Sequence, residues 1–256
     1  MLNLNLPSRE WIHIDLDETD STMLYLRRPD MLEHPAPFVL VTADFQTAGR
    51  GQRGTSWEAD AADNLLFGIA LRPVFLKPDR QFLLSEITAL AIAEALDSYV
   101  EGVSIKWPND IYVGHRKICG MLLEHDLRGG VISRTIIGPG INVNQRIFRS
   151  DAPNPVSLFQ LLHHTVSREE VMERFLQRFA DYYARLEGGG VTDEIHRTYH
   201  ERLYRRDGRL HRFRDAGGEF LARLDGVEPD GHLLLTDETG HGRRYAFKEI
   251  QYVLCS

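Results

Sequence analysis

Phe38-Val39-Leu40-Val41-Thr42-Ala43 is followed by Gly49-Arg50-Gly51-Gln52-Arg53-Gly54-Thr55-Ser56-Trp57 and then by Leu65-Leu66-Phe67-Gly68-Ile69-Ala70-Leu71. The first and third runs are apolar and partly β-branched, which predicts two strands. The run between them is polar and rich in glycine, which predicts a loop. Strand, loop and strand in this order predict a hairpin-like pair, and we therefore expect a largely antiparallel sheet.

The loop itself combines three glycines with Arg50 and Arg53 in six residues. Glycine lets a backbone approach an anion closely, and arginine offers a planar fork of donors to phosphate or carboxylate oxygens. The loop therefore predicts an anionic, nucleotide-derived ligand. Its G-x-G-x-x-G spacing also fits a dinucleotide-binding loop, but that interpretation requires a helix after the glycines, and a strand is predicted instead. A flexible surface turn would need neither two arginines nor a tryptophan.

Composition narrows the class of protein. The 256 residues suit one large domain, or a main domain with a small appendage, and 43% hydrophobic and 26% charged residues are ordinary for a globular chain. A formal charge of −7 and a pI near 5.9 argue against general nucleic-acid binding. Cys119 and Cys255 are far apart and lack metal-site spacing, so we expect a reducing compartment. Without an apolar run of spanning length or a secretory signal, we expect a cytoplasmic protein with no membrane partner.

Hydrophobic periodicity predicts an α+β fold, with a mixed, largely antiparallel sheet and packed helices. The expected strands lie near 11–15, 38–43, 65–71, 104–107, 111–113, 117–124 and 131–138, and the expected helices near 23–26, 80–100 and 168–187. From Leu203 onward, short β-like runs alternate with glycine turns, which is typical of a small β-barrel or sandwich. We therefore expect two domains, 1–202 and 203–256.

Lys106-Trp107-Pro108-Asn109-Asp110 places three polar groups at the end of a predicted strand. Lys106 suits phosphates as a point charge, and Asp110 suits Mg²⁺, although Asn-Asp after proline is also a common turn. Ten residues later, Arg116-Lys117-Ile118-Cys119-Gly120 brings a second lysine to the same part of the sheet. A surface lysine is usually just solvated, but Gly120 inside an apolar strand often marks the close approach of a ligand or a backbone.

Gly138-Pro139-Gly140-Ile141-Asn142 follows another apolar strand, and we predict a glycine turn there. Such a turn lets a flat ligand lie against the backbone, with Asn142 bonding a sugar or phosphate; a plain reverse turn fits the string equally well. His163-His164 are expected to be packing or surface residues. The sequence contains no nucleophile elbow, zinc-protease helix or Walker A loop.

These strings, in this order, closely resemble the motifs of the biotin–protein ligases over nearly the whole chain. The match rests on Asp20-Ser21-Thr22, Gln46 to Gly54 with Trp57, Lys106 to Asp110, Lys117 to Gly120 and Gly138 to Asn142. The resemblance implies a catalytic domain related to class II aminoacyl-tRNA synthetases, followed by a small SH3-like β-barrel domain. It also implies Mg²⁺ and the substrates ATP and biotin.

The resemblance assigns roles residue by residue. Lys117, Arg50 and Arg53 would be the catalytic residues that neutralise the biotin carboxylate and the phosphates. Biotin would be bound by Ser21, Thr22, Gln46, Gly49, Arg50, Lys117, Gly120, Gly138 and Gly140. ATP would be bound by Arg50, Arg53, Trp57, Lys106, Asn109 and Asn142, and Asp110 would contact Mg²⁺.

The resemblance implies that biotin is activated as biotinyl-5′-AMP and transferred to a lysine of a biotin carboxyl carrier domain. Some members carry arginine at the position of Gln52, and arginine or a similar polar residue at that of Thr55, so loop closure and retention of the intermediate are expected to differ here. The chain offers little room for a DNA-binding winged helix before Trp11, and we expect a ligase without DNA binding, as a monomer or weak homodimer. A lipoate–protein ligase of the same fold and a non-catalytic biotin-sensing module are the alternatives.

Overall fold

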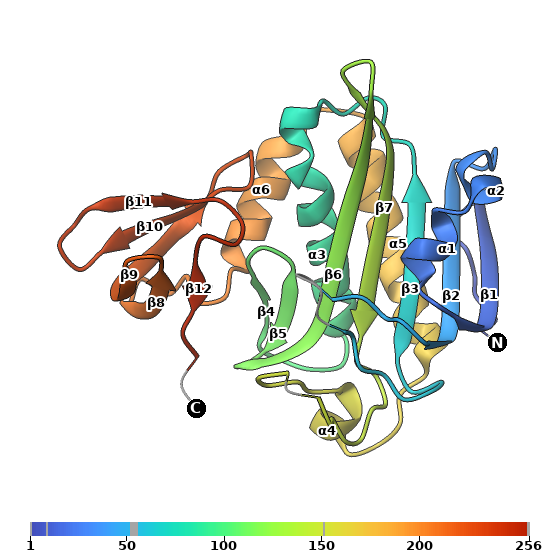
Figure 1. Cartoon of the computed structure of the whole chain (residues 1–256), viewed down its shortest axis with the longest axis horizontal. Coiled ribbons are helices and arrows are strands. Elements are labelled where there is room, and N and C mark those ends of the chain that lie inside the picture. The colour runs from blue at the N-terminus through green and yellow to red at the C-terminus, as the bar shows by residue number, and fades with distance from the viewer. Residues whose placement is uncertain (1, 9, 52–55, 151, 255–256) are drawn as a thin grey trace.

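A seven-stranded mixed sheet forms the body of the molecule (Figure 1). The computed structural model describes residues 2–8, 10–51, 56–150 and 152–254. The strand order is β1-β2-β3-β7-β6-β5-β4, and only β1 and β2 run parallel among these neighbours. This confirms the predicted largely antiparallel sheet. The strands are β1 (Trp11–Thr19), β2 (Phe38–Gln46), β3 (Leu65–Leu71), β4 (Val103–Lys106), β5 (Asp110–Val113), β6 (Arg116–Arg128) and β7 (Val131–Ile141).

The pairing of β2 with β3 decides between the two interpretations of the glycine loop. The strands are antiparallel, with Phe38 opposite Leu71 and Ala43 opposite Leu66. Both are central strands, which explains why β3 is apolar at every position: both of its faces are covered. Because β3 pairs directly with β2, the dinucleotide-binding interpretation is wrong.

Helices cover the two faces of the sheet unequally. The long helices α3 (Phe82–Leu96) and α5 (Arg168–Glu187) lie on one face, where Phe67 of β3 meets Phe175 of α5 at 5.2 Å between ring centroids. The short helices α1 (Thr22–Leu26) and α2 (Pro29–Leu32) cover the other face, over a smaller cluster that includes Val39 and Val41. Leu40 points to the first face, as the two-residue period of a strand requires.

The C-terminal residues form a second, five-stranded antiparallel sheet of order β11-β10-β9-β8-β12. Its strands are β8 (His211–Asp215), β9 (Gly218–Val227), β10 (Leu233–Asp237), β11 (Gly242–Tyr245) and β12 (Gln251–Tyr252). They fall within the predicted 203–256 module, while the domain boundary itself stays a prediction. Residues flanking the strands connect the two sheets: the indole of Trp107, just after β4, donates to the carbonyl of Gly231 in the β9–β10 turn at 2.9 Å, and Leu203, before β8, bridges Ile105 of β4.

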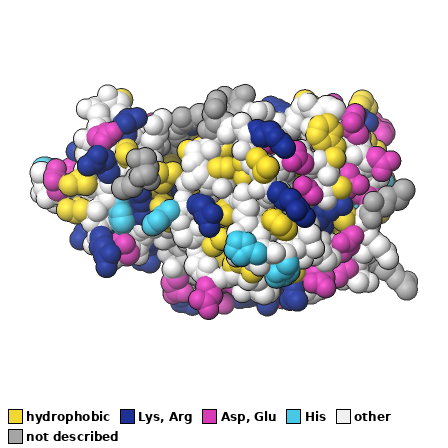
Figure 2. All heavy atoms as spheres, turned by 90° about the horizontal axis from the view of Figure 1, so that it is seen from below, with side chains coloured by type: hydrophobic (Ala, Val, Ile, Leu, Met, Phe, Trp, Pro, Cys, Tyr) yellow, Lys and Arg dark blue, Asp and Glu magenta, His cyan; other side chains and the backbone are white. Residues whose placement is uncertain are grey.

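Four short elements escape the sequence prediction: α2, α4 (Leu158–Leu162), α6 (Thr192–Glu201) and the 3₁₀ turn Pro78–Arg80. The prediction of a turn at Gly138–Gly140 is wrong, because β7 continues to Ile141 and stays paired with β6. Among the described residues, no helix combines the length and apolar character needed to cross a membrane. On the face seen in Figure 2, basic and acidic side chains are interspersed, with apolar ones scattered between them.

Candidate functional site

A cavity of about 900 Å³ lies between the two sheets and the base of the loop of residues 49–57, called the arginine–glycine loop below; Arg50, Gly51, Ser56 and Trp57 of this loop line the cavity. Of the fifteen residues assigned to the site from the sequence, thirteen line this cavity; Gly49 lies beside it, and Arg53 falls outside the described residues. The thirteen come from five separate segments, which the sheet brings together. They are Ser21, Thr22, Gln46, Arg50, Trp57, Lys106, Asn109, Asp110, Lys117, Gly120, Gly138, Gly140 and Asn142.

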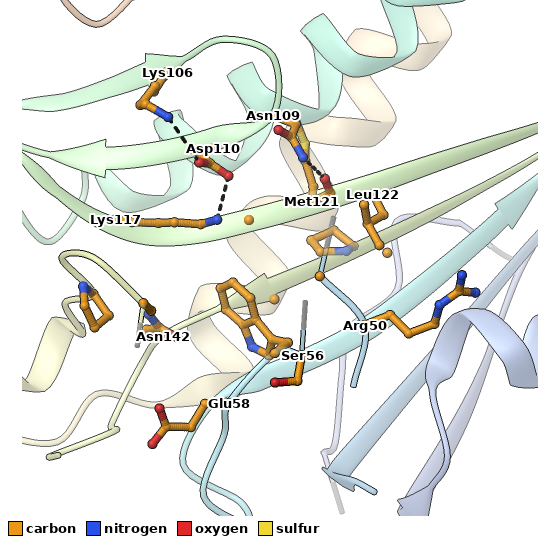
Figure 3. A pocket seen from close by; sticks show the side chains of 18 of the residues that line it. Arg50, Ser56, Glu58, Lys106, Asn109, Asp110, Lys117, Met121, Leu122 and Asn142 are labelled. Carbon is orange, nitrogen blue, oxygen red and sulfur yellow. Dashed lines mark hydrogen bonds and ion pairs between the residues drawn. The ribbon is translucent and has the colours of Figure 1, made fainter. Parts of the chain in front are cut away.

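Asp110 holds two lysines at one end of the cavity (Figure 3). Its Oδ1 lies 2.7 Å from the ammonium nitrogen of Lys117, and its Oδ2 lies 3.7 Å from that of Lys106. The geometry follows from the register of the sheet, because Lys106 and Asp110 face each other across the β4–β5 pair and β6 runs alongside. The cluster carries two positive charges and one negative charge, so it leaves a net positive charge facing the cavity.

Lys106 is the more enclosed of the two lysines, with 17% of its side chain exposed against 30% for Lys117. Burial lowers the pKa of Lys106 below its usual range, while Asp110 acts in the opposite direction. The ammonium also lies over two aromatic rings, 5.3 Å from that of Tyr112 and 5.0 Å from that of Tyr252. An anion entering the cavity would therefore meet a poorly hydrated ammonium group.

Thr22 and Gln46 meet away from the lysines, at the edge of α1. The backbone N–H of Thr22 donates to Oε1 of Gln46 at 2.8 Å, and the Thr22 hydroxyl donates to the same oxygen at 3.2 Å. The Gln46 amide oxygen is thereby engaged, which leaves its NH₂ group as a donor for a ligand. Ser21 stands at the N-terminus of α1, but its side chain does not cap the helix.

Arg50 lies far from the lysine cluster in Figure 3, and its guanidinium points away from it. Nη1 of Arg50 is 3.8 Å from a carboxylate oxygen of Glu124, which also binds Arg27. Half of the Arg50 side chain is exposed, so the pairing with Glu124 is weak. In this arrangement Arg50 lines the cavity without contacting Lys117, the other predicted catalytic residue that the structure describes.

Two asparagines of the predicted ATP site are partly engaged by the protein. The side-chain NH₂ of Asn109 donates to the Met121 carbonyl, which ties the turn after β4 to β6. Asn142 donates to the Val156 carbonyl at 3.0 Å, while its own oxygen is buried and finds no partner within the described part of the chain. Asn142 therefore keeps one acceptor for a ligand, and Asn109 acts mainly to hold the turn.

Residues of the second sheet complete the cavity, and sequence reasoning missed them. Phe247, Ile250, Gln251, Tyr252 and Leu254 line the wall near Lys106. No motif marks them, because they are an ordinary stretch around a two-residue strand. Their place in the site follows only from how the two sheets pack.

Two buried polar side chains, Asn64 and Gln145, connect segments that carry site residues. Asn64 donates to Gln145 at 2.8 Å and accepts from the backbone N–H of Val143 at 2.9 Å. Gln145 is fully buried and also accepts from the backbone N–H of Asp60. These bonds tie the segment after Asn142 to the segment after Trp57.

The cavity thus combines a positively charged end with an end lined by amide and hydroxyl groups. The sequence profile of the biotin/lipoate A/B protein ligase family matches residues 16–142. The biotin–[acetyl-CoA-carboxylase] ligase of Paracoccus denitrificans is 30% identical over 209 residues, which cover 78% of this chain and 85% of that protein. The chain therefore belongs to the biotin/lipoate A/B protein ligase family, and its similarity within that family is to the biotin–protein ligases.

Other relatives agree with this placement. The bifunctional ligase/repressor BirA of Bacillus spizizenii is 30% identical over 215 residues, which cover 81% of this chain but only 64% of the length of that protein. Among solved structures, the biotin protein ligase of Aquifex aeolicus in complex with biotin and ATP superposes with a TM-score of 0.77 at 26% identity. That superposition covers 94% of this chain and 99% of the other.

Proposed function

We propose that this protein is a biotin–protein ligase that forms biotinyl-5′-AMP from biotin and ATP and then transfers biotin to a lysine of a biotin carboxyl carrier domain. One observation carries the proposal: the Thr22–Gln46 pair and the Lys106–Asp110–Lys117 cluster line one cavity, large enough for both substrates. The solved complex of the Aquifex relative with biotin and ATP supports the choice of substrates.

The first step joins two anions, and the cavity is suited to that problem. An oxygen of the biotin carboxylate attacks the α-phosphorus of ATP, and the bond from that phosphorus to the bridging oxygen of pyrophosphate breaks. We propose that Lys117 and Arg50 reduce the repulsion between the carboxylate and the phosphates, with Arg53 as a further cation. Lys106 would stabilise the charge of the departing pyrophosphate. Lys106 and Lys117, which Asp110 holds in place before the reaction, would lower its barrier without reorganising, whereas Arg50 would first have to turn away from Glu124.

The second step transfers the biotinyl group. The amine nitrogen of the carrier lysine attacks the acyl carbon, the bond from that carbon to the AMP oxygen breaks, and the amine proton leaves to solvent. Holding the two reactants in register supplies about 7–11 kcal/mol of the barrier in well-oriented systems. We propose that Gln46 donates through its NH₂ group to the ureido oxygen of biotin, with Ser21, Thr22, Gly49 and Gly138 around the ring.

Magnesium is part of the same proposal, as a component of the Mg·ATP substrate. Mg²⁺ is usually held by one or two carboxylates together with substrate phosphates. Both oxygens of Asp110 already face ammonium groups, and no three His, Cys, Asp or Glu side chains of the described part of the chain gather around it. The residues present therefore do not build a resident magnesium site, and the contact of Asp110 with Mg²⁺ stays a prediction.

The test is mass spectrometry of two purified acceptors, a biotin carboxyl carrier domain and a lipoyl domain. Each is incubated with the protein, Mg·ATP and either biotin or lipoate. We expect a mass gain of one biotinyl group on the carrier domain only. Modification of the lipoyl domain alone would favour the lipoate–protein ligase, and binding of biotin without transfer or pyrophosphate release would favour a biotin-sensing module.

The predicted cytoplasmic location, the absence of a DNA partner and the monomeric or weakly dimeric state belong to the same proposal. Sedimentation velocity with and without biotin and Mg·ATP tests the oligomeric state.

A further inference from the structure

Gly120 and Gly140 face each other across two strands at the floor of the cavity. They are direct partners in the β6–β7 register. Neither has a positive φ angle, so the backbone at both positions is open to any L-residue. Glycine weakens a strand because it packs nothing and loses more freedom on folding. Something other than backbone conformation must therefore require glycine here.

The side chain of Trp57 occupies the space that two β-carbons would need. A β-carbon on Gly140 would lie 2.6 Å from Cε2 and 2.7 Å from Nε1 of the indole, and one on Gly120 would lie 3.0 Å from Cζ3. The Gly140 distances are shorter than β-carbon contacts allow, so a side chain there would displace the ring. At Gly120 the contact with the ring is tight, and Cε and Nζ of Lys117 lie at the same 3.0 Å. The indole thus rests on a floor of two facing glycines, and Gly140 is the stricter of the two.

Packing, rather than hydrogen bonding, holds the ring in this place. The indole N–H is buried and has no hydrogen-bond partner among the residues that the structure describes. The ammonium of Lys117 lies 5.6 Å from the ring centroid, which adds a cation–π attraction. Because no directional bond fixes the ring, its position depends on the shape of the floor beneath it.

The backbone of Trp57 closes the base of the arginine–glycine loop. Its N–H donates to the Gly49 carbonyl at 2.9 Å, and Arg50 and Ser56 form an antiparallel bridge beside it. The position of the indole therefore determines where the loop base sits, and with it the start of the Arg50 side chain.

We propose that Gly120 and Gly140 are positioning residues that seat the indole of Trp57, and that through this seat they place the loop base and Arg50 over the cavity. Their role is then to accommodate a residue of the protein, in place of the direct contact with biotin that the family resemblance implies. The effect expected on enzyme kinetics rests on the proposed ligase function. The effect expected on the fluorescence of Trp57 does not depend on that function.

A double-mutant cycle tests the kinetic part. Gly140→Ala and Gly120→Ala are made alone and in a Trp57→Leu background, and biotin-dependent exchange of pyrophosphate into ATP is measured. We expect Gly140→Ala to raise the KM for ATP at least tenfold with kcat changed less than threefold, because the loop base moves while Lys117 stays. In the Trp57→Leu background, the same substitution should change kcat/KM less than threefold. An equal loss in both backgrounds would mean that the glycine touches the ligand itself, and would overturn the proposal.

Tryptophan fluorescence tests, without any substrate, whether the indole of Trp57 is seated on Gly120 and Gly140 (the seat). The chain has three tryptophans, and Trp11 and Trp107 are buried, so subtracting the spectrum of Trp57→Phe isolates the emission of Trp57. We expect Gly140→Ala to shift this emission to longer wavelength, because the ring is displaced toward water. The matched control is Gly138→Ala on the same strand, whose β-carbon would meet Met23 instead of the indole. An unshifted Trp57 spectrum in Gly140→Ala would overturn the seat.

If Gly140→Ala lowers stability, the melting temperatures of the single and double variants test the seat instead. Removal of the indole should then recover most of the lost Tm in the Gly140→Ala/Trp57→Leu protein, and a loss that persists in the double variant would contradict the seat. If the unmodified protein shows no biotin-dependent exchange, the ligase proposal fails, whereas the emission and Tm results still decide on the seat.

Discussion

Asp110→Asn is expected to destabilise the protein strongly, because it removes the one negative charge shared by two enclosed lysines. The substitution keeps the size of the side chain while Lys117 at 2.7 Å and Lys106 at 3.7 Å lose their counter-charge. Breaking a buried pair from one side typically costs about 3–5 kcal/mol. The side chains of this cluster retain some exposure, so we expect a loss of about 2–4 kcal/mol in the free energy of unfolding at pH 7.

The protonation of Lys106 sets an upper limit on that loss and makes it depend on pH. When burying the charged ammonium costs more than deprotonating it, Lys106 loses its proton in the folded protein. Deprotonation costs about 1.4 kcal/mol for each pH unit by which the pH lies below the pKa of the unfolded lysine. This cost is therefore the largest loss of stability that the charge of Lys106 can cause. From the ordinary lysine pKa of 10.5, the limit for this group is about 5 kcal/mol at pH 7 and about 2 kcal/mol at pH 9. The pKa of Lys106 is lowered on folding, so the destabilising effect of its charge is full at low pH and is relieved as the pH rises. The difference between Asp110→Asn and the parent protein should therefore shrink from pH 7 to pH 9.

Urea denaturation at the two pH values measures the effect, with the slope of the transition as a check on two-state behaviour. In a Lys106→Met background, Asp110→Asn should cost at least about 1 kcal/mol less than in the parent protein, because the more enclosed ammonium is gone and only the pair with the more exposed Lys117 is broken. As a matched control, Asp60→Asn breaks an exposed pair with Arg149 and should cost less than about 0.5 kcal/mol. A cost below about 1 kcal/mol for Asp110→Asn at pH 7, or an equal cost in both backgrounds, would refute the reasoning.

Three further predictions follow from single contacts of the site and its support. Lys117→Met should lower biotin-dependent pyrophosphate exchange by about a hundredfold or more with a folded circular-dichroism spectrum, because a fixed cation is lost from the reacting groups; unchanged exchange would remove Lys117 from the mechanism. Gln46→Glu keeps an acceptor for Thr22 but replaces the NH₂ donor with a carboxylate, so the KM for biotin should rise about tenfold or more in steady-state assays, and an unchanged KM would exclude the proposed bond to biotin. Nδ1 of His196 lies 2.6 Å from a carboxylate oxygen of the buried Glu86; this pairing raises the pKa of His196, while burial raises the pKa of Glu86. Stability from this pair is full below pH 6.5 and is lost as the pH rises through the folded pKa, so urea unfolding of His196→Gln should show a loss of about 1–2 kcal/mol at pH 5.5 and a smaller one at pH 8.5; equal losses would contradict the assignment.

The sequence predicted best those elements whose signal is local and repeated. Helix α5 occupies 168–187 as predicted, because apolar residues recur along one face, Ser167 caps its start and glycines follow its end. Strand β3 occupies 65–71 as predicted, because its uninterrupted apolar run suits only a strand covered on both faces. Helix α6 was missed, because it buries little more than Ile195 and Tyr199, and its packing against distant elements supplies the rest.

The glycines of the site show where a local signal is ambiguous. Gly138-Pro139-Gly140 has the composition of a turn, and a turn was predicted there. In the structure these residues are the end of β7, where Gly138 leaves room for Met23 and Gly140 leaves room for Trp57. Glycine reports that space or conformational freedom is needed, but the sequence alone does not say which of the two.

By itself, the sequence determined the strand–loop–strand pattern around Arg50, the antiparallel character of the sheet and the charged string from Lys106 to Asp110, whereas Ser21, Thr22 and Gln46 entered only through the family resemblance. The loop, the strands and the charged string can be recognised from residues close together in the sequence, because they show as a run of glycines, a period of two or charged residues at the end of a strand. The tertiary structure alone decided that Asp110 lies between two lysines, that the segment 247–254 closes the cavity and that Trp57 rests on two facing glycines. The physical reason is that these contacts join segments far apart in the chain, and the register of the sheet and the packing of the two sheets bring them together.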